Sequence, residues 1–452
     1  MKLKRLLYIF LILLGAAVIV ACLYLNSLMP IITGYAAKNL CSDVFVSGRK
    51  PEKVESLDLN FSFIKYVRNK VDFKDKSVTS SFLWGKSTAI YRKGFGSTLL
   101  RGVSEDSLRK TAFPQEKPEY LQDTLKWPMG NIVSYSMPSG INRESVNQIA
   151  RMLIDSNAYK GDAFAFMIVY KGIPVVEAYK PDFNMNTRFL SWSMAKSFLN
   201  AFVGIMVKDG ELEINQRADI DEWKNDGRSK ITINDLMQMQ SGLKWNENYG
   251  NRSDVTVMLH CQENMGRFAF EQPQEFPAGT KWYYSSGTAN IVSWLIRKKF
   301  DTDSSYYKFA HDNLFEKIGI EDAVFEVDPS GTFVGSSYLY LTARDYARFG
   351  LLYLNDGVFN GQRILPEGWV KYTVTPASGS NGKYGSLFWL NRSKRYRSAP
   401  EDMYSCEGHD GQMIIIIPSR QLVMVVLGFS QTSTGGMDFD RLIRDVLLTV
   451  KS

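Results

Sequence analysis

The chain has 452 residues, of which 45% are hydrophobic and 22% charged, and this ordinary globular composition excludes a mainly disordered or fibrous protein. The net charge of +7 is mild and its basic residues are spread along the chain, so nucleic-acid binding is not indicated. Three histidines and four scattered cysteines, with no His-Glu-x-x-His motif, predict neither a metal centre nor a disulfide scaffold, and we expect no cofactor.

The N-terminus departs most from the globular average. Lys2, Lys4 and Arg5 precede a charge-free run over residues 6–37, whose apolar part at 6–25 is 20 residues long and matches one membrane-spanning helix. We expect residues 1–37 to be an uncleaved anchor in the inner (cytoplasmic) membrane. Because basic flanks stay in the cytoplasm, the rest of the chain would lie on the periplasmic or extracellular side.

Two alternatives remain for this segment. It resembles a cleaved signal peptide, although the run is long for one. Ile19-Val-Ala-Cys22 also resembles the lipobox of a bacterial lipoprotein, with the lipid on Cys22. All three interpretations place the remaining chain outside the cytoplasm. Cys41, Cys261 and Cys406 would then meet an oxidising environment, in which three thiols leave at least one unpaired.

Residues 38–149 predict an extension of short strands and loops, and clearer periodicity begins after it. Residues 142–156 have helical spacing. Apolar strands are predicted at 164–170 and 173–179, joined by the hairpin signal Lys171-Gly172. A helix is predicted from Ser193 to Val207.

Helices dominate residues 211–375, and strands return near the C-terminus. The strands are predicted at 386–390, 412–417 and 421–428, before a final helix at 438–450. Strands at both ends with helices between them predict an α/β fold of the α+β type, in which one antiparallel sheet is flanked by helices and carries a mostly helical subdomain. Because early and late strands must pair, residues 150–452 should form one domain.

Ser193-Met-Ala-Lys196 is the first motif with chemical content. Ser-x-x-Lys occurs seven times in the chain, so only context distinguishes this copy. Ser193 opens a helix, and Lys196 lies one turn later on the same side. The apolar helix around Lys196 would lower its pKa and let a neutral amine activate the Ser193 hydroxyl. The alternative is that Ser193 is only a helix cap and Lys196 extends to solvent.

Two later motifs favour the catalytic interpretation of Ser193 and Lys196 over the helix cap. Tyr284-Ser-Ser286 leads into another apolar helix, and Gly408-His409-Asp-Gly precedes an apolar strand. The order Ser-x-x-Lys, Tyr-x-Ser, His-x-Gly resembles the serine β-lactamase and penicillin-binding-protein superfamily. The stretches 189–197, 338–350 and 408–412 resemble its class C-like branch, which includes the 6-aminohexanoate-dimer (nylon-oligomer) hydrolases and esterases. This resemblance implies a β-lactamase/transpeptidase-like fold over 150–452.

The resemblance also implies roles for individual residues. Ser193 would be the nucleophile that forms an acyl-enzyme, Lys196 would take its proton, and Tyr284 would pass the proton to the leaving group. His409 stands where penicillin-binding proteins commonly have the Lys of Lys-Thr-Gly, and would bind substrate or orient Tyr284. The backbone N–H groups of Ser193 and Gln412 would form the oxyanion hole.

Two further positions are implied as substrate-binding residues. Ser286 replaces an Asn that is frequent in the superfamily, and Tyr249 matches a loop tyrosine of the nylon-oligomer branch. Without Lys-Thr-Gly and that Asn, the usual anchors for a β-lactam are altered. The resemblance therefore implies esterase or amidase activity, with weak β-lactam hydrolysis.

The function expected from the sequence is a membrane-anchored serine hydrolase that cleaves a small-molecule or peptide ester or amide. The alternative is a penicillin-binding sensor or a D,D-peptidase-like protein that acts on peptidoglycan peptides. An α/β-hydrolase is excluded because no Gly-x-Ser-x-Gly occurs in the chain. Neither the physiological substrate nor the oligomeric state follows from the sequence.

Overall fold

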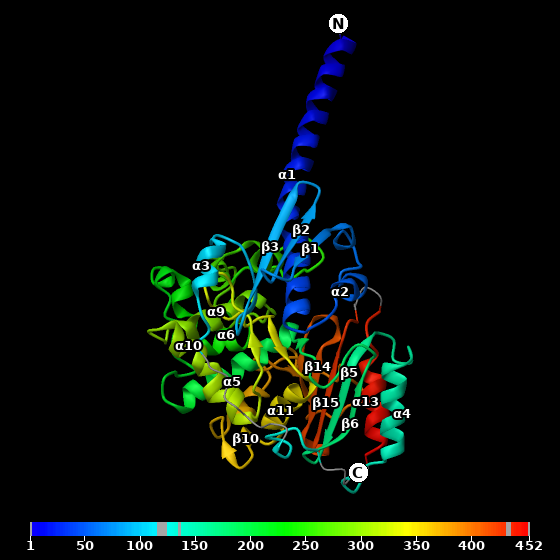
Figure 1. Cartoon of the computed structure of the whole chain (residues 1–452). Helices are drawn as coiled ribbons and strands as arrows, with labels where there is room; N and C mark the ends of the chain where they lie inside the picture. Colours follow the sequence, from blue (N-terminus) through cyan, green and yellow to red (C-terminus); the bar gives the residue numbers. More distant parts are fainter. Residues whose placement is uncertain (1, 115–123, 134–136, 431–434, 451–452) are drawn as a thin grey trace.

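The computed structural model describes residues 2–114, 124–133, 137–430 and 435–450. These residues form a long N-terminal helix with a small sheet beside it, a larger sheet covered by helices, and a mostly helical region (Figure 1).

The first helix, α1 (Lys2–Phe45), has two different environments along its length. Residues 4–26 are exposed, whereas most side chains between residues 29 and 44 are buried. Within the described residues, α1 is the one helix long and apolar enough to cross a membrane. The helix does not end at residue 37, where the charge-free run ends. It continues to Phe45 because its second half packs against the extension.

The described part of the extension contains the short strands expected from the sequence. Its four-stranded sheet has the order β1-β2-β3-β4, with antiparallel neighbours. Leu40 and Cys41 of α1 share a buried apolar cluster with Val78 and Ala89 of the sheet. The elements are α2 (Pro51–Leu57), η1 (Ile64–Tyr66), β1 (Arg68–Asp72), β2 (Ser77–Phe82), β3 (Gly85–Arg92), β4 (Gly96–Leu99) and α3 (Glu105–Lys110).

The larger sheet has six antiparallel strands in the order β12-β13-β14-β15-β5-β6. β15 pairs with β5, for example at Val426 and Phe166, which confirms that early and late segments share one sheet. The strand expected at 386–390 is reduced to its last two residues, since Leu387 has a φ of 55° that a strand does not allow. The strands are β5 (Ala163–Tyr170), β6 (Ile173–Tyr179), β12 (Trp389–Leu390), β13 (Tyr404–Glu407), β14 (Met413–Ile417) and β15 (Leu422–Gly428).

Both faces of this sheet are covered, because β14 and β15 are apolar on each side. Ile415 and Val426 face a cluster shared with α4 (Arg143–Ile154) and α13 (Phe439–Leu448). Alternate residues of the same strands face the larger core, which includes α5 (Ala195–Lys208) and α11 (Ala343–Leu354). Strand alternation thus places α11 directly against β14, β15 and β5, and α5 lies on the same side of the sheet.

The helical region lies on the α5 side of the sheet (Figure 1). A small sheet of order β7-β9-β8 connects it to the segment before α5. This architecture confirms the predicted fold class of an antiparallel sheet flanked by helices with a mostly helical subdomain. The remaining elements named below are β7 (Phe189–Leu190), η3 (Trp192–Met194), α6 (Ile233–Met237), α7 (Asp254–Cys261), α8 (Met265–Phe270), α9 (Ser286–Arg297), α10 (Asp303–Ala310), β8 (Val324–Phe325), β9 (Leu339–Leu341), α12 (Trp369–Thr373) and η8 (His409–Gly411).

Candidate active site

Ser193 lies where the short strand β7 turns into helix α5. The predicted helix start is a 3₁₀ turn, η3, which contains Ser193 and is followed by α5 from Ala195. Trp192, just before the serine, has a φ of 45°, a left-handed conformation that is strained for a residue with a side chain. The hydroxyl of Ser191 holds this turn, 2.8 Å from the Trp192 carbonyl oxygen. The turn leaves Ser193 partly exposed, whereas its neighbours are buried.

Lys196 is buried beneath Ser193, with 1% of its surface exposed. Its Nζ lies 2.9 Å from the Ser193 Oγ, 3.0 Å from the Ser286 Oγ and 2.9 Å from the Ser336 carbonyl oxygen. Burial lowers the pKa of Lys196 to about 8, and the nearby negative charge of Glu247 opposes that shift. The lysine therefore does not extend to solvent, and its amine can accept a proton near neutral pH.

Tyr284 joins this pair from the loop before α9. Its ring centroid lies 5.0 Å from the Lys196 Nζ. The ring stacks on Trp389 at 5.2 Å. Desolvation raises the pKa of Tyr284 well above its ordinary value, so the phenol keeps its proton at neutral pH. Lys196 thus contacts both of the residues predicted to act with it, Ser193 and Tyr284.

Ser286 is fully buried and lies between Lys196 and a carboxylate that the sequence analysis did not identify. The Ser286 hydroxyl donates to Glu247, and the Ser286 backbone N–H donates to the same carboxylate at 2.8 Å. The indole N–H of Trp245 also donates to Glu247. Since both sides of the Ser286 hydroxyl are engaged, this geometry favours a role in positioning Lys196 over substrate contact.

His409 and Tyr249 lie together on the other side of Ser193. Their rings stack at 4.9 Å with an interplanar angle of 17°, and His409 also meets the edge of Trp192 at 5.4 Å. The His409 side chain is 35% exposed, and its Nε2 lies 3.3 Å from the Asp410 carboxylate. These contacts place His409 next to Tyr249, whereas the Tyr284 ring stacks on Trp389 and meets Tyr384 edge to face. The geometry thus favours the predicted substrate contact of His409 over orientation of Tyr284.

The turn that contains Gln412 packs directly against the turn before Ser193. A Cβ on Gly408 would lie 2.2 Å from the Ser191 carbonyl oxygen, so only glycine allows this approach. The Gly408 N–H donates to the Gln412 carbonyl at 2.8 Å and closes the turn. The Gln412 amide side chain is hydrogen-bonded to the backbone of Gly428. The Gln412 side chain and carbonyl are therefore both engaged, which leaves its backbone N–H as the group that could meet a substrate oxygen.

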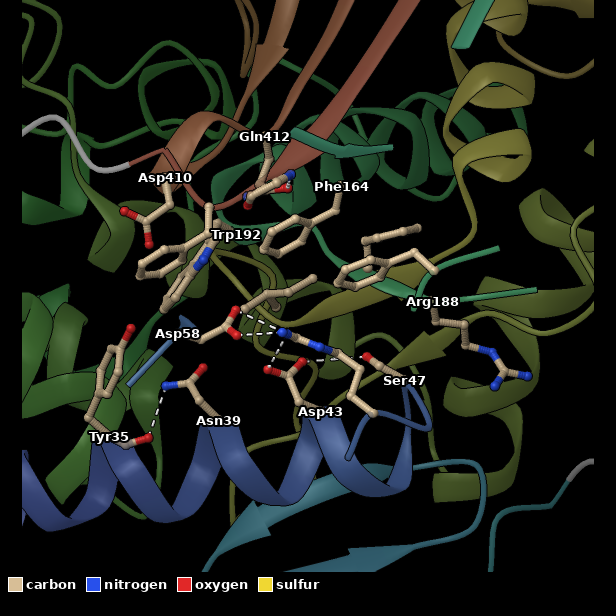
Figure 2. A pocket seen from close by; sticks show the side chains of 16 residues that line it. Tyr35, Asn39, Asp43, Ser47, Asp58, Phe164, Arg188, Trp192, Asp410 and Gln412 are labelled. Atoms are coloured by element: carbon tan, nitrogen blue, oxygen red, sulfur yellow. Dashed lines mark hydrogen bonds and ion pairs between the residues drawn. The ribbon is translucent and has the colours of Figure 1, made fainter. Parts of the chain in front are cut away.

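The N-terminal extension reaches this site as well, which the sequence did not indicate. The Tyr35 ring of α1 stacks on Trp192, with centroids 6.4 Å apart and planes at 20°. Figure 2 shows α1 facing Trp192, Asp410 and Gln412 across a pocket of about 50 Å³. A pocket of this size holds a few waters and no substrate residue. It marks the boundary where the extension packs against the catalytic domain.

All four cysteines are free thiols in the structure. Cys41 and Cys406 are buried, and burial raises the pKa of Cys41 to about 12. Neither thiol is placed or ionised for nucleophilic chemistry at neutral pH.

Comparison with known proteins agrees with the site geometry. The profile of the family described as Beta-lactamase matches residues 147–450. The 6-aminohexanoate-dimer hydrolase of Paenarthrobacter ureafaciens is 24% identical over 289 residues, which cover 58% of this chain and 71% of that protein.

Two solved structures share the fold. One is a candidate 6-aminohexanoate-dimer hydrolase from Bacillus anthracis, with a TM-score of 0.56, 20% identity, and coverage of 71% of this chain and 86% of the other. The second is a family VIII carboxylesterase, with a TM-score of 0.53, 14% identity, and coverage of 71% and 99%. The profile match extends over more than half of the chain and confirms the resemblance stated from the motifs. The chain belongs to the beta-lactamase family and is a serine hydrolase.

Proposed function

We propose that this protein is a membrane-anchored hydrolase that cleaves an amide or ester bond through an acyl-enzyme on Ser193. The observation that carries the proposal is the contact between the partly exposed Ser193 hydroxyl and the buried Lys196 amine, at 2.9 Å. A serine hydroxyl is a weak nucleophile until a neighbouring base removes its proton. Lys196 is that base, because burial makes its neutral form accessible.

In the acylation step, the Ser193 Oγ attacks the substrate carbonyl carbon while its proton moves to the neutral Lys196 amine. The negative charge that develops on the carbonyl oxygen is held by the backbone N–H groups of Ser193 and Gln412, where each such donor is typically worth about 3 kcal/mol of barrier. The bond to the leaving nitrogen or oxygen then breaks. The Tyr284 phenol donates its proton to the leaving group and recovers one from Lys196.

In the deacylation step, water attacks the acyl carbon and the same groups act in reverse. Water gives its proton to the Tyr284–Lys196 pair, and the ester bond to Ser193 breaks as the serine oxygen regains a proton. The product is a carboxylic acid. No metal or redox group takes part in either step.

The walls of the site and the relatives support a proposal for the substrate class. Tyr249, His409 and Trp192 form an aromatic and weakly polar wall near Ser193. His409 stands where many penicillin-binding proteins have a lysine, so a strong cationic anchor for a β-lactam carboxylate is missing from this position. A linear amide or ester with an apolar acyl chain fits this wall best. The 6-aminohexanoate dimer cleaved by the Paenarthrobacter ureafaciens relative is such an amide.

The test is acyl-enzyme detection with the full-length chain in detergent. We expect p-nitrophenyl acetate and 6-aminohexanoate dimer to be turned over, with a transient adduct that peptide mapping assigns to Ser193. Labelled penicillin should react slowly. A long-lived penicillin adduct without turnover of any ester or amide would instead establish the sensor function.

The membrane attachment rests on α1. The helix is unbroken at Cys22 and continues into the buried core of the extension, as expected of an anchor built into the domain. The basic residues Lys2, Lys4 and Arg5 orient it with its start in the cytoplasm. We therefore propose that the catalytic domain lies on the periplasmic or extracellular side.

The pH dependence of kcat/KM should follow the protonation state of Lys196. Because the neutral amine is the base and its pKa is about 8, kcat/KM should rise with pH and level off above about 8. The Glu247 charge raises the pKa of Lys196, so Glu247→Gln should move the rising limb to lower pH. Steady-state rates on a nitrophenyl ester from about pH 6 to about pH 10 measure both effects.

The matched control is Glu211→Gln, an exposed glutamate beyond the far end of α5. Its profile should coincide with that of the unmodified protein. If kcat/KM of Glu247→Gln rises over the same pH range as that of the unmodified protein, this carboxylate does not raise the pKa of Lys196.

A further inference from the structure

The β2–β3 hairpin meets α1 at the point where the exposed half of that helix ends. The indole N–H of Trp84, in the turn of the hairpin, donates to the Asn26 side chain at 3.0 Å. A Cβ on Gly85 would lie 2.6 Å from the Met29 Cβ, so the hairpin packs tightly on the helix here. In Figure 1 the hairpin runs along α1 toward its N-terminal, exposed part. The turn therefore lies beside the last exposed residue of the apolar segment.

This end of the extension exposes large apolar side chains. Leu83 and Trp84 are 67% and 58% exposed, and Phe63 and Tyr66 are 58% and 60% exposed. Phe63 lies beside the hairpin, with its ring 6.4 Å from that of Phe82. Leu83 has a φ of 50°, at a turn position that Asn, Asp or Gly normally occupies. We call Phe63, Tyr66, Leu83 and Trp84 the hairpin patch. An exposed cluster of large apolar side chains is unfavourable in water and marks an interaction site.

Basic residues border the hairpin patch. The strand register aligns Arg68 with Ser81 and Ser81 with Lys86, so both basic residues lie in the second row from the turn. Lys65 lies next to Tyr66, with its Nζ 5.1 Å from the ring centroid. None of these three cations forms an ion pair with a residue that the structure describes. They are free to bind an anionic surface.

The position of the patch along α1 matches the edge of a bilayer. Residues 6–25 rise by about 30 Å as a helix, which is the thickness of the hydrocarbon core. Pro30 has no N–H to donate to the carbonyl of Asn26, four residues earlier. An unpaired carbonyl is costly in hydrocarbon, so Asn26 belongs in the polar headgroup layer. Trp84, which is hydrogen-bonded to Asn26, lies at the same depth, in the membrane–water interface where tryptophan is enriched.

We propose that the hairpin patch is a second membrane contact, which rests on the bilayer surface beside the α1 anchor. Leu83 and Trp84 enter the interfacial layer, and Lys65, Arg68 and Lys86 bind the headgroups of anionic lipids. This inference rests on the proposed membrane anchor. Two points of contact would prevent the catalytic domain from tilting about α1.

Spin labels on the full-length chain in vesicles test this proposal. The vesicles contain equal parts of phosphatidylcholine and phosphatidylglycerol, and Cys22→Ala and Cys261→Ser remove the accessible native thiols. Labels are placed by Ile12→Cys in the apolar segment, Leu83→Cys in the patch, and Leu448→Cys as an exposed apolar control (79% exposed) on α13. Accessibility to oxygen and to a water-soluble nickel chelate reports the depth of each label, and ester hydrolysis confirms that each variant is folded.

We expect the labels at 12 and 83 to be more accessible to oxygen than to the chelate, and the label at 448 to show the reverse. A label at 83 that resembles the one at 448, while the label at 12 is in lipid, overturns the second contact and leaves the anchor intact. A label at 12 exposed to water overturns the anchor and the proposal with it. Vesicles of phosphatidylcholine alone should reduce the oxygen accessibility at 83, and an unchanged value overturns the role of the three cations.

Discussion

Replacing Ser193 with alanine should lower kcat for ester and amide substrates by about 10⁶-fold, since removing the nucleophile of a serine hydrolase leaves only the contribution of the oxyanion hole and substrate binding. The expected loss is this large because, in the proposed mechanism, Lys196 and Tyr284 both act through the Ser193 oxygen. Steady-state hydrolysis of a nitrophenyl ester by the full-length protein measures it. KM should change little, since the Ser193 side chain is small and contributes little to ground-state binding.

The matched control for this variant is Ser107→Ala. Ser107 also begins a Ser-x-x-Lys sequence, but it is exposed on the short helix α3 of the extension. That variant should keep the kcat of the unmodified protein. Equal rates for the two variants would refute Ser193 as the nucleophile, whereas a loss confined to Ser193→Ala shows that the sequence motif matters only in its place before α5.

The second large effect is on stability and concerns Lys38. Its Nζ forms a buried ion pair with Glu326, in a loop of the catalytic domain 288 residues away. Glu326 also accepts the Ser42 hydroxyl at 2.8 Å and the Ser97 backbone N–H at 2.6 Å. Lys38→Met leaves a fully buried carboxylate without its counter-charge, which typically costs about 3–5 kcal/mol of stability. We expect a clearly lower Tm for the protein in detergent.

The pH dependence of this loss has a defined sign. Burial raises the pKa of Glu326, and the positive charge of Lys38 opposes that shift. Without Lys38 the carboxyl should hold its proton to higher pH in the folded state than in the unfolded state. The folded state then loses stability as the pH rises, so the difference in Tm between Lys38→Met and the unmodified protein should be larger at alkaline than at acidic pH.

A double variant separates the unpaired charge from the loss of packing. Lys38→Met with Glu326→Gln removes both charges and should recover most of the lost Tm, because the buried position then holds no ion. A double variant as unstable as the single Lys38→Met would mean that the charge of Glu326 is not the cause of the destabilisation.

The sequence predicted those parts of the structure that depend on local pattern. Continuous apolar runs around the Lys171-Gly172 turn predicted strands at 164–170 and 173–179, and the structure has β5 (Ala163–Tyr170) and β6 (Ile173–Tyr179). The motif order placed Ser193, Lys196 and Tyr284 in one site, since each lies at a junction between elements where side chains can converge. Hydrophobic periodicity and motif spacing are local properties, so sequence alone reveals them.

Other features depend on contacts between distant segments. The end of the anchor was expected at residue 37 because Lys38 is charged, yet α1 continues to Phe45 and buries Lys38 against Glu326. Glu247 had only a weak signal, a carboxylate between Trp245 and Tyr249 in a loop with aromatic residues. Its contact with Ser286 requires two loops to meet. The contact of Tyr35 with Trp192 likewise requires α1 to pack beside the turn before Ser193, which no local pattern in the sequence predicts.

In the proposed membrane-anchored state, the unbroken helix α1 would limit the distance from the bilayer at which the active site can lie. Tyr35 lies nine residues after Asn26, so the side chain beside Trp192 is about 14 Å along the helix axis from the residue where we propose that the helix leaves the membrane. A flexible tether would let a catalytic domain sample a wide volume above the lipid. In the proposed anchored state, a stiff helical stalk would instead confine hydrolysis to a thin layer next to the bilayer, and substrates would reach the enzyme by lateral diffusion or by approaching the membrane.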